Sequence, residues 1–296
     1  MTTRSRRLLI MAGAGAALMT AALAWWWLAI SARLHRFDGQ RAYQDVLAQM
    51  SFGPRTPGSA AHSQAIGYIE ASLEKAGWKP RLQATTWNGF EVQNIVASRS
   101  EGAPAIILGA HYDSRLLADR DQGPGWSGAV PGANDGASGV AVLLELARSL
   151  PADSVPVWLV FFDAEDSGGL DGRDWIMGSR AFAASLTFTP RAVIIVDMVG
   201  DADLNLYYER NSDSQLRADI WRQAAELGFQ AQFIPEERHS LIDDHTPFLQ
   251  AGLPAVDIID FDYPYWHTAA DTADKVSAQS LEAVGRTLEA WIAAQR

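Results

Sequence analysis

The sequence predicts an α/β fold: a single globular domain, residues 37–296, whose mixed, mostly parallel central sheet is flanked by helices. Short apolar runs of strand length alternate along the chain with segments of helical periodicity, which is the order that produces a mainly parallel sheet. The clearest run, residues 157–162, is apolar throughout, as expected of a strand buried on both faces. Acids and glycines follow it directly, at the end of the strand where open α/β sheets bind ligands.

Residues 1–36 are predicted to form a signal-anchor or transmembrane segment. The 23 residues from Leu8 to Ile30 carry no charge and can cross a bilayer core as a helix. Three arginines precede this stretch and three tryptophans stand near its end, which favours an uncleaved anchor in the inner membrane with the domain exported to the periplasm. The alternative is a cleavable signal peptide, which would release the domain as a secreted protein.

The composition excludes several kinds of site. The chain has no cysteine, so it has neither disulfides nor thiolate metal ligands nor a cysteine nucleophile. The first 36 residues hold five arginines and no acid, which leaves 19 basic and 35 acidic residues in the domain, a net charge of −16. Nucleic acid is therefore not expected as a partner, because affinity for it comes mainly from neutralised phosphates.

The N-terminal half of the domain is expected to begin with two helices, residues 42–50 and 60–76. Ser59 is placed to cap the second helix, apolar residues recur along one face of it, and a glycine ends it. Residues 92–98 and 105–110 are expected to be strands, the second apolar enough to be central. A polar loop rich in glycine and proline follows at about residues 115–132.

The C-terminal half continues the alternation of strands and helices. Glycines close two of the expected helices, and the last helix is amphipathic. The expected elements are a helix at about 140–150, the strand 157–162, a helix containing 180–184, the strand 192–196, a helix at 216–227, a short helix at 246–251, the strand 254–259 and a helix at about 280–294.

Acids and histidines stand at the ends of four expected strands and at the start of one helix. They are His111 and Asp113, Glu165 and Asp166, Asp197, His267 (after a loop), and Asp135 before the helix. Taken singly, Asp135 is better explained as a helix N-cap, Asp197 as a turn acid and His267 as a loop histidine. Parallel strands share one carboxyl edge, however, so the groups can converge there. Imidazole and carboxylate without thiolate suit a catalytic zinc.

These residues form a series of motifs that resembles a known superfamily. In chain order they are His-x-Asp (His111, Asp113), Asn-Asp-Gly (Asp135), Glu-Asp (Glu165, Asp166), Asp-Met-x-Gly (Asp197) and Trp-His-Thr (His267). Their order resembles the zinc aminopeptidase superfamily, which also contains the animal-type (type II) glutaminyl cyclases. The resemblance runs from about residue 40 to residue 296 and implies the α/β fold of that superfamily.

The resemblance also implies metal positions. For the peptidases it implies two zinc ions, one held at the positions of His111, Asp135 and Asp197, and the other at those of Asp135, Asp166 and His267. The cyclases generally use one zinc, at the second set of positions. The acid that precedes the ligand Asp166 in the sequence, Glu165, takes the position of the general base in both.

Three further residues favour the cyclase branch. Asp243, in Asp-Asp-His-Thr-Pro-Phe, resembles an acid that forms hydrogen bonds in the cyclase active site. Trp266, directly before the ligand position His267, resembles a wall for a small side chain, and Trp175 lies in a segment similar to the one that follows the glutamate pair in cyclases. The resemblance implies that Asp197 and Asp243 assist proton transfer and that the two tryptophans bind substrate.

Two positions depart from the animal cyclases. Asp166 is a glutamate in those enzymes, so this chain has a shorter arm that still ends in a carboxylate. Asp257 stands where they have a histidine that pairs with the acid matching Asp243. Bacterial relatives of the cyclases resemble this chain more closely at both positions, which places the resemblance in the bacterial branch.

The expected function is therefore conversion of N-terminal glutamine in peptides or proteins to pyroglutamate, with one zinc and release of ammonia. A zinc aminopeptidase with two zinc ions is the alternative, since all five ligand positions of the dizinc site are filled. A membrane-anchored binding domain on an inactive peptidase fold is a third interpretation, because fold alone does not establish activity. Both enzymes would act on peptides with a free N-terminus.

Overall fold

The structure is a computed structural model that describes residues 36–121 and 128–295. The predicted anchor or signal segment at residues 8–30 lies outside the described residues. From Phe37 onward the chain forms one compact unit. Within the described ranges, no helix is both long enough and apolar enough to cross a membrane.

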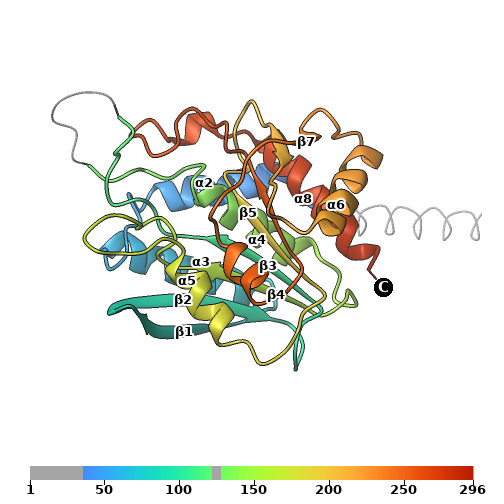
Figure 1. The fold of residues 1–296 in the computed structure, drawn as a ribbon, viewed down its shortest axis with the longest axis horizontal. Helices are drawn as coiled ribbons and strands as arrows, with labels where there is room; N and C mark the ends of the chain where they lie inside the picture. The colour runs from blue at the N-terminus through green and yellow to red at the C-terminus, as the bar shows by residue number, and fades with distance from the viewer. Residues whose placement is uncertain (1–35, 122–127, 296) are drawn as a thin grey trace, which may run out of the picture. The chain divides into compact units, whose positions relative to one another are not determined.

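A six-stranded sheet runs through the domain (Figure 1). Its strands, in spatial order, are β1 (Lys79–Trp87), β2 (Phe90–Ser98), β4 (Val157–Phe162), β3 (Ile106–His111), β5 (Ala192–Asp197) and β8 (Ala255–Ile259). The pairings from β4 to β8 are parallel, and those of β1 with β2 and of β2 with β4 are antiparallel. The prediction of a mixed, mostly parallel sheet is therefore confirmed.

Helices cover both faces of the sheet. They are α2 (Gly39–Met50), α3 (Ala60–Lys75), α4 (Ala137–Ser149), α5 (Met177–Ala184), α6 (Ser214–Glu226), α7 (Thr246–Gln250) and α8 (Ala278–Ala293), with a 3₁₀ turn, η1 (Ala273–Lys275). Each predicted helix is present with small changes of boundary, and Ser59 caps α3 as expected by accepting a hydrogen bond from the His62 amide.

The two faces of the sheet pack into separate hydrophobic clusters, because neighbouring side chains of a strand point to opposite sides. On β5, Ile194 and Val196 belong to the larger cluster with α2, α3, α4, α6 and α8, whereas Val193 and Ile195 belong to the smaller one. Phe182 of α5 and Phe248 of α7 complete the smaller cluster. Burial on both faces explains why the central strands are continuous apolar runs.

Three strands of the structure were not predicted from the sequence. Strand β1 is half exposed and contains Pro80, which edge strands tolerate, so it has no apolar run. Its hairpin turn, Asn88-Gly89, has positive φ at both residues and is the strongest short signal of a β-hairpin. Strands β6 (Leu206–Tyr208) and β7 (Phe233–Glu237) pair only with each other and are too short to be found from periodicity.

Close packing of α4 on the sheet gives the first prediction. A Cβ atom added at Gly139 would lie 2.3 Å from the Val196 carbonyl oxygen, and backbone cannot move aside easily. We expect Gly139→Ala to lower the free energy of unfolding by about 1–3 kcal/mol through overpacking. The control is Gly67→Ala on α3, where a Cβ meets nothing within 4 Å and should stabilise the helix by about 0.5–1 kcal/mol. Urea unfolding measures both changes; equal effects in the two variants would contradict this account.

Candidate active site

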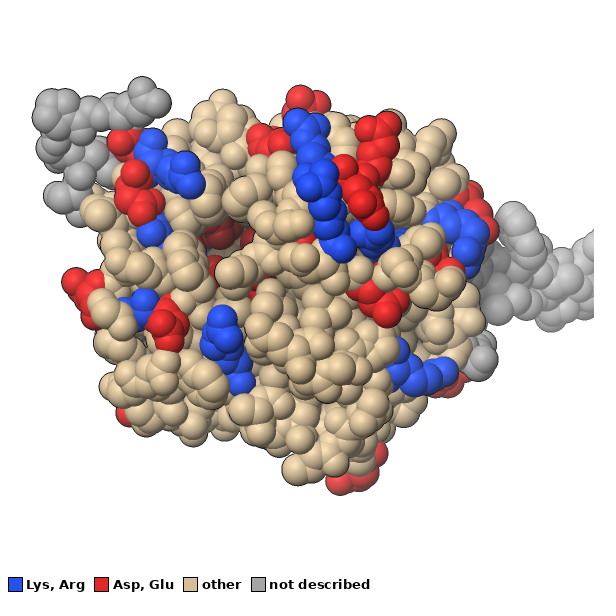
Figure 2. All heavy atoms as spheres, in the orientation of Figure 1, with Lys and Arg blue, Asp and Glu red and all other residues tan. Residues whose placement is uncertain are grey.

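The predicted site residues converge at the carboxyl edge of the parallel strands. All of them except His111 line one cavity of about 340 Å³, together with apolar residues of the loop at 240–242 and of the segment at the end of β8. The predicted residues in its lining are Asp135, Glu165, Asp166, Trp175, Asp197, Asp243, Trp266 and His267. On the face drawn in Figure 2, acidic side chains are visible at the floor of a hollow, while lysine and arginine lie interspersed with acids around it.

Unusual backbone conformations occur beside these residues. Ala164, Ile176, Met198 and His267 all have positive φ, between 46° and 58°, a region that side chains with a Cβ rarely adopt. Three of them directly adjoin a predicted site residue in sequence, and the fourth is the predicted ligand itself. Such strain persists only where surrounding structure enforces it, and it concentrates at functional sites.

The first ligand group contains Asp135, Asp166 and His267, all buried. His267 Nε2 lies 2.9 Å from Asp166 Oδ1 and 3.9 Å from Asp135 Oδ2. Among the described residues, Asp166 Oδ1 is approached by His267 and, at 3.7 Å, by Arg115, but no contact with hydrogen-bond geometry reaches either carboxylate oxygen of Asp166 or Asp135 Oδ2. Two ligands of a tetrahedral zinc at 2.0–2.1 Å are about 3.3–3.4 Å apart, so these separations suit a shared ion. Buried carboxylate oxygens that accept no hydrogen bond and lie beside an imidazole are the atoms a zinc ion would satisfy.

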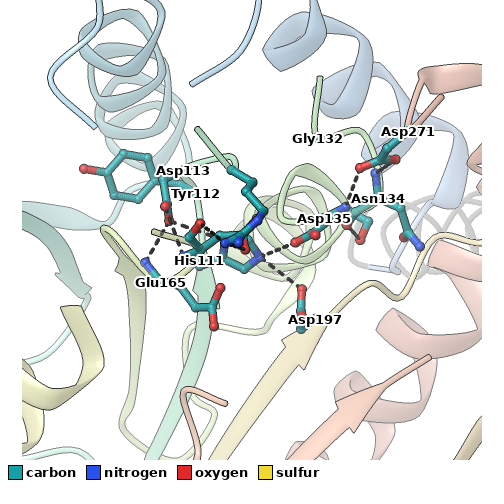
Figure 3. A network of polar contacts seen from close by, with 12 residues as sticks. His111, Tyr112, Asp113, Gly132, Asn134, Asp135, Glu165, Asp197 and Asp271 are labelled. Atoms are coloured by element: carbon teal, nitrogen blue, oxygen red, sulfur yellow. Dashed lines mark hydrogen bonds and ion pairs between the residues drawn. The ribbon is translucent and has the colours of Figure 1, made fainter. Parts of the chain in front are cut away.

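The second ligand group contains His111, Asp135 and Asp197 (Figure 3). His111 Nε2 lies 3.1 Å from an oxygen of each acid. His111 is not among the residues that line the cavity. Burial lowers the pKa of His111, but the negative charges of Asp197, Asp113 and Asp135 outweigh it and hold that pKa well above its usual range. The group therefore behaves as an ion-paired cluster that can also hold a metal ion.

The N-cap interpretation of Asp135 is wrong. The N-cap of α4 is Gly136, and no side chain in the described part of the chain caps this helix. The side chain of Asp135 instead points to His111, and its backbone amide donates to Asp271. Because the helix makes no use of the carboxylate, both oxygens remain available to a metal. Asp135 also belongs to both ligand groups, which is what a bridging ligand requires.

Asp113 fixes the acid pair after β4. Its two carboxylate oxygens accept hydrogen bonds from the backbone amides of Glu165 and Asp166, at 3.1 and 3.3 Å. With their backbone anchored in this way, both side chains line the cavity. Burial, reinforced by neighbouring carboxylates, raises the pKa of Glu165 well above its usual range, and burial raises that of Asp166 to about 6. A dication bound beside them would oppose both shifts.

Two tryptophan rings lie close to the His267 ring. The Trp175 ring is nearly parallel to it, at 8° and a centroid distance of 5.9 Å, and the Trp266 ring lies 3.9 Å away. Gly168 makes room for Trp175, since a Cβ there would fall about 2.1 Å from the indole. Phe261 packs on Trp266 at 4.8 Å. The cavity therefore has aromatic walls directly beside the predicted ligand.

Asp243 reaches the same cavity, and a buried charged cluster lies behind it. His245 stands 3.3 Å from Glu209 and 3.5 Å from Asp257 through its two ring nitrogens. Asp257, the position that departs from the animal cyclases, therefore has a histidine beside it that comes from the helix-start segment rather than from β8. Burial and nearby acids, Asp243 foremost, raise the pKa of Asp257 well above its usual range.

The segment after β3 contains residues that support the site and that were not predicted from the sequence. Buried Arg115 donates to the Asp166 and Gly168 carbonyls at 3.1 and 3.3 Å and lies over the Trp175 ring at 4.7 Å. Arg115 also pairs with Asp119, whose carboxylate lies 3.4 Å from His267 Nδ1. A carboxylate behind a ligating histidine orients the ring. The arginine-to-aspartate spacing of four was visible in the sequence, but nothing there placed it near His267.

Comparison with known proteins agrees with this geometry. The model of peptidase family M28 matches residues 94–292. A glutaminyl-peptide cyclotransferase-like protein of Bos taurus is 26% identical over 279 residues, covering 81% of this chain and 71% of that protein. The crystal structure of Porphyromonas gingivalis glutaminyl cyclase has a TM-score of 0.82 and 33% identity, covering 88% of this chain and 99% of that one. A Zn-dependent exopeptidase from Parabacteroides distasonis has a TM-score of 0.82 and 29% identity, covering 89% and 100%.

Proposed function

The chain belongs to peptidase family M28, and from that premise we propose that it is a zinc-dependent glutaminyl-peptide cyclotransferase. The observation that carries the proposal is the cavity itself, in which Glu165 and Asp243 share one space with the two tryptophans beside His267. A bacterial glutaminyl cyclase is among the solved structures it resembles, at 33% identity.

The substrate is a peptide or protein with an N-terminal glutamine and a free α-amine. The amine nitrogen attacks the side-chain amide carbon, the bond from that carbon to the amide nitrogen breaks, and ammonia leaves while a five-membered lactam remains. Because the nucleophile is tethered to the electrophile, the enzyme needs to hold the bent conformer rather than bring two molecules together. The cavity and its aromatic walls suit that task.

Each predicted residue has a defined part in the reaction. Zinc, when held by Asp135, Asp166 and His267, supplies a Lewis acid that polarises the side-chain carbonyl. Glu165 takes a proton from the attacking amine and delivers it to the departing nitrogen, which general acid–base catalysis requires of one carboxylate near both atoms. Asp197 and Asp243 stabilise the positive charge that moves with this proton.

The tryptophans decide between cyclisation and hydrolysis. Trp175 and Trp266 enclose the glutamine side chain and keep water away from its amide carbon. Water in the same place would yield glutamate instead of pyroglutamate. Phe261 and the other apolar residues of the cavity lining extend this apolar surface.

A zinc aminopeptidase is the second candidate, and one observation favours it. The group of His111, Asp135 and Asp197 is as compact as the group that includes His267, so the residues of a dizinc site are all in place. In that reaction Glu165 would activate water against the first peptide bond. We propose one zinc for the cyclase and reserve the second position for the aminopeptidase.

Parallel substrate assays test the proposal directly. The purified domain without residues 1–36 is expected to release ammonia from Gln-peptides and to form pyroglutamyl products, seen as a loss of 17 Da by mass spectrometry, the mass of one ammonia. Peptides with N-terminal leucine or alanine serve as the control and should stay intact. Rapid cleavage of those peptides without ammonia from Gln-peptides would favour the aminopeptidase.

We also propose that the enzyme acts outside the cytoplasm, anchored in the inner membrane through residues 8–30. The uncharged stretch with preceding arginines supports an anchor, and its orientation sends the domain to the periplasmic side. Membrane fractionation of the full-length chain tests the anchor. Recovery of a shortened protein in the soluble periplasmic fraction would instead identify a cleaved signal peptide.

A further inference from the structure

The segment that carries His267 returns to the start of α4 through one buried residue, Asp271. Its carboxylate accepts hydrogen bonds from the backbone amides of Asn134 and Asp135, at 2.9 and 3.2 Å (Figure 3). The Asp271 carbonyl accepts a further bond from the Ala133 amide. Asp271 is fully buried. The Asp271 carboxylate thus holds the backbone of Asp135, the residue that belongs to both ligand groups.

Asp271 is in turn held by a residue that precedes His267 in the sequence. Tyr263, buried four residues before His267, donates its hydroxyl to Asp271 at 2.7 Å. The hydrogen bond closes the loop at 263–271 around the ligand it carries. The position of His267 and the position of Asp135 therefore depend on the same carboxylate.

A third ligand segment joins through Asn134. Its side-chain oxygen accepts a hydrogen bond from the Gly200 amide at 2.7 Å, three residues after Asp197. Its carbonyl accepts from Ser138 Oγ, which in turn accepts from the Val199 amide at 3.1 Å. The loops that carry Asp135, Asp197 and His267 thus come from three distant parts of the chain and meet at the pair Asn134 and Asp271.

We propose that Asp271 is a positioning residue for zinc, which preorganises the ligands by tying the Asp135 loop to the His267 loop. The proposal rests on the zinc site of the proposed function but not on the reaction performed there. Ligands held in place before the ion arrives bind it more tightly, because less order is imposed on binding. Outer-shell partners of metal ligands are typically worth about 10–100-fold in metal affinity.

Zinc affinity, measured by competition with a chromophoric chelator on folded protein, tests the proposal. Asp271→Asn replaces one acceptor oxygen by a donor that faces a backbone N–H, and we expect zinc to bind about 10–100-fold more weakly. The rise in Tm on adding zinc should shrink in parallel. Tyr263→Phe leaves the carboxylate and removes one bond to it, so we expect a smaller loss of affinity, several-fold by the same reasoning.

The matched control lies on α2, away from the site. Asp45 is also a buried carboxylate that accepts a tyrosine hydroxyl, that of Tyr68 at 2.6 Å. Asp45→Asn and Tyr68→Phe should lower Tm with and without zinc alike and leave zinc affinity unchanged. Zinc affinity within twofold of wild type in Asp271→Asn would overturn the proposal, as would an equal loss in Asp45→Asn.

The zinc-affinity test remains decisive even if the Asp271→Asn variant does not fold. If Asp271→Asn does not fold, wild-type zinc affinity in Tyr263→Phe overturns the proposal, and a weaker affinity supports it. If the wild-type domain binds no zinc, the zinc site and this proposal both fall. If zinc binds and depends on Asp271 but Gln-peptides are not cyclised, only the proposed reaction fails.

Discussion

Glu165→Gln is expected to bind zinc as the wild type does and to lose cyclisation by about 10²–10⁴-fold in kcat, the usual contribution of a general acid–base residue. Glutamine keeps the shape of the side chain but cannot take the proton from the attacking amine. The backbone bond from Glu165 to Asp113 does not involve the substituted group, so the local fold should persist. Steady-state kinetics with a Gln-peptide, together with zinc analysis of the same preparation, measure both parts.

The adjacent residue provides the control for this prediction. Asp166→Asn changes a carboxylate of similar burial one position along the chain, but that carboxylate lies beside His267 in the first ligand group. It should lose zinc and activity together, whereas Glu165→Gln should lose activity alone. A turnover like that of the wild type in Glu165→Gln would remove Glu165 from the mechanism. A joint loss of zinc and activity in both variants would make Glu165 a ligand.

The sequence predicted that these residues converge because they lie where regular structure ends. Buried parallel strands produce apolar runs, and the residue after each run is placed at a known edge of the sheet. His111, Glu165 and Asp197 could therefore be assigned to one edge from local patterns alone. The adjacent acids Glu165 and Asp166 leave the strand before they turn inward, which is why both face the cavity.

The support around the ligands could not be predicted in the same way. Asp271 and Asp119 act through contacts made by irregular loops, with backbone amides or rings more than a hundred residues distant in sequence. No periodicity marks such residues. Asp135 shows the converse error, since an acid before a helix usually caps it, yet tertiary contacts at the start of α4 direct its side chain elsewhere. Edge strand β1 was not predicted because none of its residues is buried and it therefore has no apolar run.

The two histidine ligand positions should differ sharply in their importance for zinc. His267→Ala removes a ring that approaches both Asp166 and Asp135, and we expect the domain to lose zinc and cyclisation together. Zinc affinity should fall by more than the factor of about 10–100 that is typical of losing an outer-shell partner, because a direct ligand is gone. Zinc content after dialysis and ammonia release from a Gln-peptide measure both effects.

His111→Ala is the matched variant that distinguishes one zinc from two. It removes an equally buried imidazole that contacts Asp135 and Asp197 but not Asp166. With one zinc held at the His267 group, His111→Ala should keep close to one zinc per chain and lose activity only in part, since Asp197 loses its partner. A wild-type domain with two zinc ions, reduced to one in His111→Ala with loss of peptide hydrolysis, would identify the aminopeptidase. The order of zinc loss in the two variants therefore reports which ligand group is occupied, independently of the substrate chosen.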